Sequence, residues 1–268
     1  MIGDIVGNPG RKIVCQSLRG LIKRDSIDLV VANAENAAGG SGLTPAIYEE
    51  LVKAGVGAMT LGDHIYRRRS IIPVLQSKKN IVKPANYPAD APGHDHCVVT
   101  TSEGVLVAVI SLIGRVFMKP VDCPFAAVDR VLEKLPESVK VVFVDMHAEA
   151  TSDMQLMGRF LDGRVSAVLG THTHVPTADE TILPQGTAFQ CDVGMTGPYE
   201  SILGRRIDRV LQTTQTFAPT PFDVASDDVR LSGTLVDIDH QSGQATAIRR
   251  ICLSEAEAIQ IANAEASS

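Results

Sequence analysis

Apolar residues along the chain occur in short β-branched runs that alternate with longer amphipathic stretches. This alternation is typical of a sheet flanked by helices, because buried strands and helix faces repeat with different periods. The runs predict strands at 29–33, 58–61, 97–101, 105–111, 139–146, 165–169, 188–192 and 233–239, with a very short strand at 1–3 before them. The pattern therefore predicts an α/β fold.

The intervening stretches predict helices at 9–24, 45–54 and 151–161. Pro9 stands in the first turn of the first helix, where its missing N–H is tolerated. Thr44 is expected to cap the second helix, and Gly55 follows its end. The third helix is expected to be capped by Thr151 or Ser152.

The C-terminal part of the chain shows a different pattern. Residues 233–252 alternate apolar and polar positions on both sides of a turn at 240–243, which predicts an antiparallel hairpin at the edge of a sheet or in a second sheet. The remaining segment, 254–268, is rich in Ala and Glu and is expected to be a frayed helix or disordered. No linker divides the chain, so residues 1–253 are predicted to form one domain.

Composition limits the classes of partner. Of the 268 residues, 44% are hydrophobic and 21% are charged, which is enough apolar material for a core. The net charge is −6, aromatic residues make up 4% of the chain, and Trp is absent. A protein that binds nucleic acid needs a basic face and usually stacking rings, so the composition favours a small-molecule partner.

Membrane insertion and secretion are also disfavoured. The longest apolar run, residues 105–113, is about half as long as a membrane helix requires. The chain shows no basic region followed by an apolar stretch at its start, so no signal peptide is expected. Its five cysteines are widely spaced and form no CxxC pair, which is typical of reduced thiols and indicates a cytoplasmic location.

Polar side chains that can bind metals follow one predicted strand after another. In an α/β sheet the carboxyl ends of parallel strands open on one edge, where ligands bind. We therefore expect these side chains to meet at one rim: Asp4, Glu35, Asn36, Asp63, His64, His147, His172 and His174.

This set suits a pair of divalent cations, which prefer imidazole with carboxylate and amide oxygens. Two such ions, about 3.5–4 Å apart, can hold a bridging hydroxide and clamp a phosphate for in-line displacement. Glu35 or Asp4 is the candidate for the carboxylate between them. Each residue alone also has a structural explanation, with Asp4 in a turn and His147 hydrogen-bonded in the core. The recurrence of such residues after five segments favours the dinuclear site.

Six motifs, in chain order, identify a family. They are GDIVG (3–7), NAENAAGG (33–40), LGDH (61–64), HAEATS (147–152), GTHTH (170–174) and DVGMTGP (192–198). With them, residues 1–253 resemble the calcineurin-like metallophosphoesterase superfamily, and within it the bacterial 2′,3′-cyclic-nucleotide phosphodiesterases that carry the NAEN signature.

The resemblance implies a four-layer α/β/β/α fold and a site residue by residue. Asp4, Glu35, Asn36 and His174 would hold one metal, and Glu35, Asp63, His147 and His172 the other, with Glu35 bridging. His64 matches the catalytic histidine, which would protonate the leaving ribose oxygen or brace the phosphate. The implied metals are iron or manganese, the implied reaction is attack by a metal-bridging hydroxide on a 2′,3′-cyclic nucleotide, and a homo-oligomer is implied as an option.

The sequence departs from the family pattern at two positions. The usual Gly-Asn-His is Gly-Asp63-His64 here, and Tyr66 stands where relatives commonly have Trp. Asp63 adds a third carboxylate to the site, so we expect a weaker pull on an anionic phosphodiester and a less acidic bound water. Only three residues precede Asp4, so its strand is expected to be truncated or the true start to lie upstream.

Further positions are candidates for substrate contact. Gly39 and Gly40 belong to a Gly-rich segment that either cradles phosphate or merely connects two elements, and Arg67 is either a substrate contact or part of a solvated face. Asp192, Gly194 and Thr196 are expected to line the pocket. Glu149 is either an orienting partner of a ligand or part of the next helix start.

Two other functions use the same ligand set. One is a phosphatase, or a phosphodiesterase that acts on a different small phosphoester. The other is a metal-loaded regulatory protein with vestigial activity, which the Asp63 substitution favours.

Overall fold

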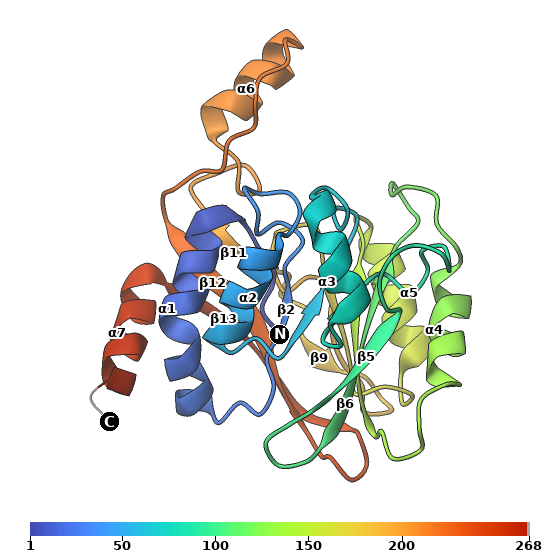
Figure 1. The fold of residues 1–268 in the computed structure, drawn as a ribbon. Coiled ribbons are helices and arrows are strands. Elements are labelled where there is room, and N and C mark those ends of the chain that lie inside the picture. Colours follow the sequence, from blue (N-terminus) through green and yellow to red (C-terminus); the bar gives the residue numbers. More distant parts are fainter. Residues whose placement is uncertain (267–268) are drawn as a thin grey trace.

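A computed structural model describes residues 1–266 of the chain (Figure 1). Two β-layers lie face to face, and helices cover the outer face of each. The strands of both layers end at a common rim, which carries the candidate site. The expectation of a four-layer α/β/β/α sandwich is therefore confirmed.

The first layer combines two short parallel ladders with a long hairpin. One part, in the order β2-β3-β4, comprises β2 (Val31–Asn33), β3 (Ala58–Thr60) and β4 (Ile81–Val82). The other part, in the order β1-β11-β12-β13, comprises β1 (Asp4–Ile5), β11 (Met195–Pro198), β12 (Val229–Ile238) and β13 (Ala245–Ser254). Ile2 bridges to Ala32 on one side and to Gly233 on the other, and so joins the two parts. The predicted antiparallel hairpin is β12–β13 and is confirmed.

The second layer is a six-stranded sheet in the order β5-β6-β7-β8-β10-β9. It consists of β5 (His96–Thr100), β6 (Leu106–Ile113), β7 (Val141–His147), β8 (Ala167–Thr171), β9 (Thr181–Ile182) and β10 (Ala188–Gln190). The four inner strands are parallel, and the edge strands β5 and β9 are antiparallel to their neighbours.

Helices pack on the outer faces. Against the first layer lie α1 (Gly7–Asp25), α2 (Pro45–Ala54) and α3 (Ile72–Ser77), preceded by a 3₁₀ turn at Arg69–Ile71, together with α7 (Glu255–Ala266). Against the second lie α4 (Pro124–Leu132) and α5 (Thr151–Leu161). The remaining helix, α6 (Ile207–Thr216), projects away from the body (Figure 1).

Three apolar clusters fill the three spaces between the layers. One packs helices on the first layer, a second packs helices on the six-stranded sheet, and a third lies between the two β-layers. Strand β7 shows how its sequence serves two of them: Val142, Val144 and Met146 face the helices, whereas Val141 and Phe143 face the other sheet. The same period of two turns Asp145 and His147 toward the space between the sheets.

One expected helix cap is confirmed, and two other local expectations are corrected. The side chain of Thr44 caps α2 by accepting a hydrogen bond from the Ile47 N–H at 3.4 Å, as predicted. Helix α5 instead begins directly after Ala150, and neither Thr151 nor Ser152 caps it. Asp4 lies on the first strand instead of after it, because the parallel pairing with β11 begins at Asp4 itself.

The segment after residue 253 contains α7, which packs against α1. Ala258 is buried, and α7 approaches α1 so closely that a Cβ on Gly20 would lie 2.7 Å from the Ile261 carbonyl oxygen. The prediction for residues 267 and 268 lies outside the described residues. A division of the chain at residue 253 stays a prediction.

Among residues 1–266, no helix has both the length and the apolar character needed to cross a membrane.

Candidate metal centre

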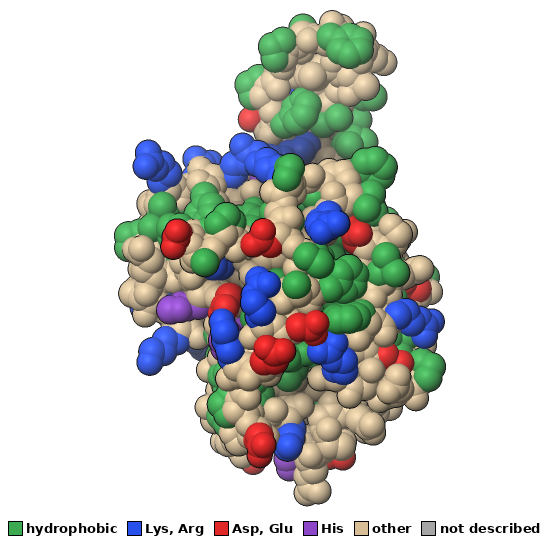
Figure 2. All heavy atoms as spheres, turned by 90° about the vertical axis from the view of Figure 1, so that its right-hand side faces the viewer, with side chains coloured by type: hydrophobic (Ala, Val, Ile, Leu, Met, Phe, Trp, Pro, Cys, Tyr) green, Lys and Arg blue, Asp and Glu red, His purple; other side chains and the backbone are tan. Residues whose placement is uncertain are grey.

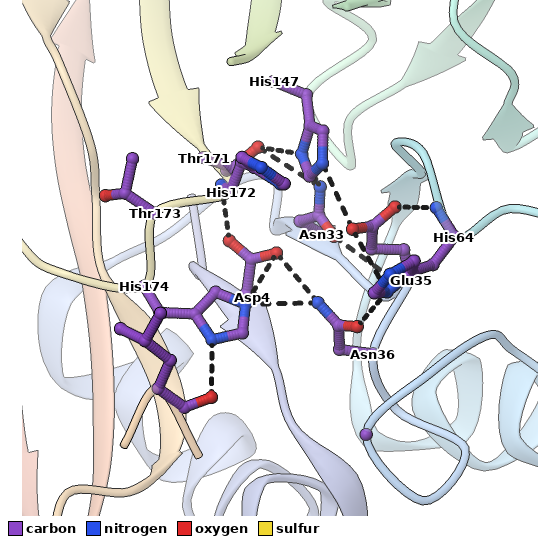
Figure 3. A network of polar contacts seen from close by, with 12 residues as sticks. Asp4, Asn33, Glu35, Asn36, His64, His147, Thr171, His172, Thr173 and His174 are labelled. Atoms are coloured by element: carbon purple, nitrogen blue, oxygen red, sulfur yellow. Dashed lines mark hydrogen bonds and ion pairs between the residues drawn. The ribbon is translucent and has the colours of Figure 1, made fainter. Parts of the chain in front are cut away.

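The rim of the sandwich collects side chains from five separate segments (Figure 3). Asp4 comes from β1, Glu35 and Asn36 from the loop after β2, and Asp63 and His64 from the loop after β3. His147 is the last residue of β7, and His172 and His174 come from the loop after β8. The structure therefore brings together every residue that the sequence predicted for the metal site.

Four of these residues form a compact cluster. Glu35, Asp63, His147 and His172 each offer one ligand atom, and these atoms all lie within 4.8 Å of one another. Nε2 of His147 is 3.1 Å from Oε1 of Glu35 and 3.5 Å from Oδ1 of Asp63, and Oδ1 of Asp63 is 3.7 Å from Nδ1 of His172.

Three polar atoms at the centre of this cluster are buried and unsatisfied. Oε1 of Glu35, Oδ1 of Asp63 and Nε2 of His147 make no hydrogen bond to any described residue, although the nitrogen lies within ion-pair distance of both oxygens. Burying such groups without a partner costs about 1–3 kcal/mol each, so native structures rarely leave them together. Their convergence and their chemistry, two carboxylate oxygens and an imidazole nitrogen, fit a divalent cation.

Asp4, Asn36 and His174 form a second group beside the first. Oδ1 of Asp4 is 3.6 Å from Nε2 of His174 and accepts a hydrogen bond from Nδ2 of Asn36 at 3.4 Å. The amide oxygen of Asn36 faces Nδ1 of His64, at 2.7 Å, so Asn36 presents its NH₂ group to Asp4 and His174. Coordination of a cation there by Asn36 requires a half-turn of this amide.

The electrostatics of the site couple its acids to its imidazoles. Burial alone raises the pKa of Asp4, but His174 and the backbone N–H of His172 hold it at about 2. Burial opposes charge on His147 as well, yet Glu35 raises its pKa well above the ordinary value. The pKa of Asp63 lies below its usual range because the neighbouring histidines outweigh its burial. The cluster thus favours ionised carboxylates and compensating positive charge.

His64 lies at the edge of the cluster and is partly exposed, unlike the buried His147. Its backbone N–H donates to Oε2 of Glu35 at 2.9 Å, and its Nδ1 contacts the Asn36 amide oxygen. The backbone contact holds the segment of His64 against Glu35, and the Nδ1 contact orients the ring, whose other side is partly exposed.

The loop after β8 is held in an unusual conformation. His172 and His174 have positive φ values of 98° and 65°, which are uncommon for residues other than glycine and often mark functional sites. Asp192 fixes this loop by accepting hydrogen bonds from the backbone N–H and the hydroxyl of Thr173, at 2.9 and 2.8 Å. Burial, followed by repulsion from Asp4, raises the pKa of Asp192 to about 7.

Polar contacts hold both histidines of this loop. Nδ1 of His174 lies 3.1 Å from the carbonyl oxygen of Leu203, which turns its Nε2 toward Asp4. Nε2 of His172 lies 3.2 Å from Oε2 of Glu149, which turns its Nδ1 toward Asp63. Glu149 therefore contacts His172, and its role as an orienting partner of a ligand stays a prediction.

The six candidate substrate contacts lie in different surroundings. Gly39 and Gly40 have positive φ values, and their carbonyl oxygens accept hydrogen bonds from Arg205. Arg67 is exposed next to the His64 segment. Asp192, Gly194 and Thr196 are buried; the Gly194 carbonyl accepts from the Asp4 N–H at 3.1 Å, and the Thr196 hydroxyl donates to the Ser232 carbonyl at 3.0 Å.

Sequence reasoning missed a buried polar network behind His147. It contains Asn33, Thr60, Asp145 and Thr171, all fully buried. Burial raises the pKa of Asp145 to about 6, although its hydrogen bonds and the nearby His147 oppose this shift. The signal was present in the sequence, because each of these residues is a polar position at or near the end of an otherwise apolar strand.

The fold and the site together are those of a metallophosphoesterase. Residues 1–251 match the family model described as YmdB-like protein, and the chain belongs to this family. It is 42% identical, over 95% of its length and 96% of the relative's, to the 2′,3′-cyclic-nucleotide 2′-phosphodiesterase of Bacillus subtilis.

Two solved structures share the fold. A hypothetical protein from Thermus thermophilus superposes with a TM-score of 0.88 at 41% identity, over 94% of this chain and 97% of that one. A novel phosphatase from Mycoplasma pneumoniae superposes with a TM-score of 0.88 at 30% identity, over 94% of this chain and 92% of that one.

Proposed function

We propose that the chain is a dinuclear-metal phosphodiesterase that hydrolyses 2′,3′-cyclic nucleotides to nucleoside monophosphates. The observation that carries the proposal is the convergence of three buried, unsatisfied ligand atoms, from Glu35, Asp63 and His147, at the rim of a metallophosphoesterase fold. The similarity to a 2′,3′-cyclic-nucleotide 2′-phosphodiesterase over nearly the whole chain supports the substrate class.

Seven residues hold the two metals in this proposal. Asp4, Asn36 and His174 would hold the first metal, Asp63, His147 and His172 would hold the second, and Glu35 would serve both. All donors are nitrogen or oxygen, and no thiolate is among them, which suits divalent iron or manganese. When bound, these ions neutralise charge on the phosphate and make water acidic enough to act as a nucleophile.

The residues around the metals orient the reactants. His64, partly exposed and fixed by Glu35 and Asn36, protonates the leaving ribose oxygen from the open side. Arg67 attracts the anionic substrate from the surface beside it. Gly39 and Gly40, whose carbonyl oxygens accept hydrogen bonds from Arg205, form the backbone next to Asn36 along which the nucleotide would approach. Asp192, Gly194 and Thr196 shape the wall of the pocket by fixing the loops that carry Asp4 and His174.

Three substrates separate this activity from its nearest alternative. The similarity to a structure described as a novel phosphatase favours a phosphomonoesterase as the second candidate. We expect the chain to hydrolyse 2′,3′-cyclic AMP and a bis-aryl phosphate, and to leave an aryl monophosphate largely intact. A preference for the aryl monophosphate contradicts the proposal, and metal loading without turnover of any phosphoester favours the regulatory alternative.

His64 gives the proposal a residue-level test. The change His64→Ala removes the proton donor but no proposed metal ligand. We expect turnover of 2′,3′-cyclic AMP to fall about 10²–10⁴-fold with unchanged metal content. Equal turnover in the variant contradicts the role of His64.

The arm formed by residues 199–228, which includes α6, supports self-association. No residue of α6, which lies wholly in the described chain, is buried, and Leu211, Phe217 and Phe222 are exposed on the arm. Figure 2 shows mostly hydrophobic and uncharged atoms there. We include a homo-oligomer in the proposal, and sedimentation of the parent and a Leu211→Ser/Phe217→Ser variant tests it: only the parent should exceed monomer mass.

The five free cysteines, all within the described residues, support a cytoplasmic location.

A further inference from the structure

Four fully buried polar residues lie behind His147, on the side away from the metal cluster: Asn33, Thr60, Asp145 and Thr171. Each stands at or near the carboxyl end of a different strand, β2, β3, β7 and β8. Strand neighbours two residues earlier, such as Val31 and Phe143, pack between the two sheets. The alternation along each strand therefore turns all four side chains into the same inter-sheet space.

We propose that Thr171 and Asp145 are positioning residues that hold His147 in the one tautomer and orientation able to bind a metal through Nε2. This inference rests on the metal centre proposed above, but not on the identity of the substrate. Beyond the seven proposed metal ligands, it assigns a role to a series of contacts that runs from His147 through a hydroxyl to a buried carboxylate.

The donors and acceptors in this series of contacts fix the direction of each hydrogen bond. Oγ1 of Thr171 lies 2.7 Å from Oδ1 of Asp145 and 2.9 Å from Nδ1 of His147. A carboxylate only accepts, so the single hydroxyl proton of Thr171 goes to Asp145. The hydroxyl oxygen must then accept from Nδ1–H of His147. Because this contact keeps a proton on Nδ1, Nε2 is the nitrogen that gives up its proton to bind a metal beside Glu35 and Asp63.

Asn33 closes the network from the opposite sheet. Its amide oxygen accepts a hydrogen bond from the Glu35 N–H at 3.2 Å, and a backbone N–H can only donate, so the orientation of the amide is fixed. Its NH₂ group therefore faces Oδ2 of Asp145, at 3.2 Å, and Oγ1 of Thr171, at 3.3 Å, and lies farther from Nδ1 of His147, at 3.4 Å, than the Thr171 hydroxyl does. The Thr60 hydroxyl also donates to Oδ2 of Asp145. Asp145 thus joins both sheets directly beneath the ligands Glu35 and His147.

Substitutions at Thr171 test the proposal on metal binding alone. Thr171→Val keeps the shape of the side chain and removes the hydroxyl, whereas Thr171→Ser keeps the hydroxyl. We expect the Val variant to bind Mn²⁺ about 10–100-fold more weakly in calorimetric titration of the full chain, the usual effect of losing such an outer partner. The Ser variant should bind within about threefold of the parent, a smaller change than the loss expected for the Val variant.

Thr187→Val is the matched control, because Thr187 is equally buried but precedes β10 at the opposite end of the strands. Its hydroxyl donates to the Val165 carbonyl at 2.7 Å, so the change also removes a buried hydrogen bond. It should lower stability without changing Mn²⁺ affinity. Unchanged affinity in Thr171→Val, or an equal loss in Thr187→Val, overturns the proposal.

A second measurement needs no substitution and decides the matter even if Thr171→Val does not fold. In ¹⁵N-histidine NMR of the Zn²⁺-loaded parent chain, His147 should carry its proton on Nδ1, in slow exchange with water. A proton on Nε2 overturns the proposal. A parent that binds Mn²⁺ but does not hydrolyse cyclic nucleotides contradicts the proposed substrate and leaves this inference standing, whereas a parent that binds no Mn²⁺ contradicts both.

Discussion

Asp63 adds a third carboxylate to the candidate site, and its surroundings show how this charge is held. Its side chain is partly buried, and its carboxylate lies 3.5 Å from His147 and 3.7 Å from His172. The pKa of Asp63 lies below its usual range, so the group is ionised at neutral pH. Together with Asp4 and Glu35, Asp63 gives the site three carboxylates. Three carboxylates neutralise more of the charge of bound metal ions than two would.

Asp63→Asn tests the consequence of that third charge. We expect Mn²⁺ affinity to fall about tenfold, the lower end of the effect of weakening a metal site. Turnover of 2′,3′-cyclic AMP at saturating Mn²⁺ should rise and its pH optimum should move lower, because less negative charge opposes the acidity of bound water. Metal titration and a pH–rate profile measure both. Unchanged affinity, optimum and turnover refute this explanation.

A residue of the site was predictable where a side chain that can bind a metal comes directly at the end of a strand. His147, His172 and Glu35 stand where apolar runs end, and parallel strands bring such ends together. Asp145 and Thr171 share this property, but they act through hydrogen bonds to another residue, and a strand-end polar side chain alone does not reveal its partner. The amide orientation of Asn36 depends on His64, which lies on a different loop, so only the structure gives it.

At the scale of elements, long periodic segments were predictable and short or exposed ones were not. Helices α1 and α2 and the β12–β13 hairpin follow directly from their patterns. Strands β1 and β4 have two residues each, too few to show a period, and exist because neighbouring strands pair with them. Within the described residues, α6 has no buried side chain, so no pattern of core positions in its sequence predicted a helix. Helix α7 depends on contact with α1, which its composition does not encode.

Because α7 packs closely on α1, we expect a Gly-to-Ala substitution in α1 to lower the stability of the protein, although such a substitution normally stabilises a helix. Gly20→Ala in an isolated helix stabilises by about 0.5–1 kcal/mol. Here the added Cβ would lie 2.7 Å from the Ile261 carbonyl oxygen, so we expect a net loss of about 1–3 kcal/mol in the free energy of unfolding, measured by urea denaturation. In a chain that ends at residue 254 the same substitution should stabilise. Stabilisation of the full chain by Gly20→Ala would show that α7 does not pack there.

At the scale of the whole molecule, the site exists because two β-layers end at one rim. Asp4, Glu35 and Asp63 come from the first layer, whereas His147 and His172 come from the second. Ions bound between them would link the two layers, and metal binding would then stabilise the entire sandwich.

Metal removal should accordingly destabilise the whole fold. Binding that is specific to the native state adds about 2.7 kcal/mol at a ligand concentration of a hundred times Kd. For a domain of this size that gain corresponds to a rise in Tm of about 5 °C. We expect Mn²⁺ to produce this rise in chelator-treated protein and to produce little in His147→Ala, as followed by calorimetry. An equal rise in both proteins contradicts binding at this rim.

In our proposal, this chain uses two metal ions at the rim to cleave a cyclic phosphodiester. The most direct test is the metal content per chain of anaerobically purified protein, determined together with its rate of 2′,3′-cyclic AMP hydrolysis before and after chelation. We predict two ions of iron or manganese per chain, loss of hydrolysis when they are removed, and recovery when Mn²⁺ or Fe²⁺ is restored. Hydrolysis at full rate by the metal-free chain, or two bound ions with no hydrolysis, would contradict the claim.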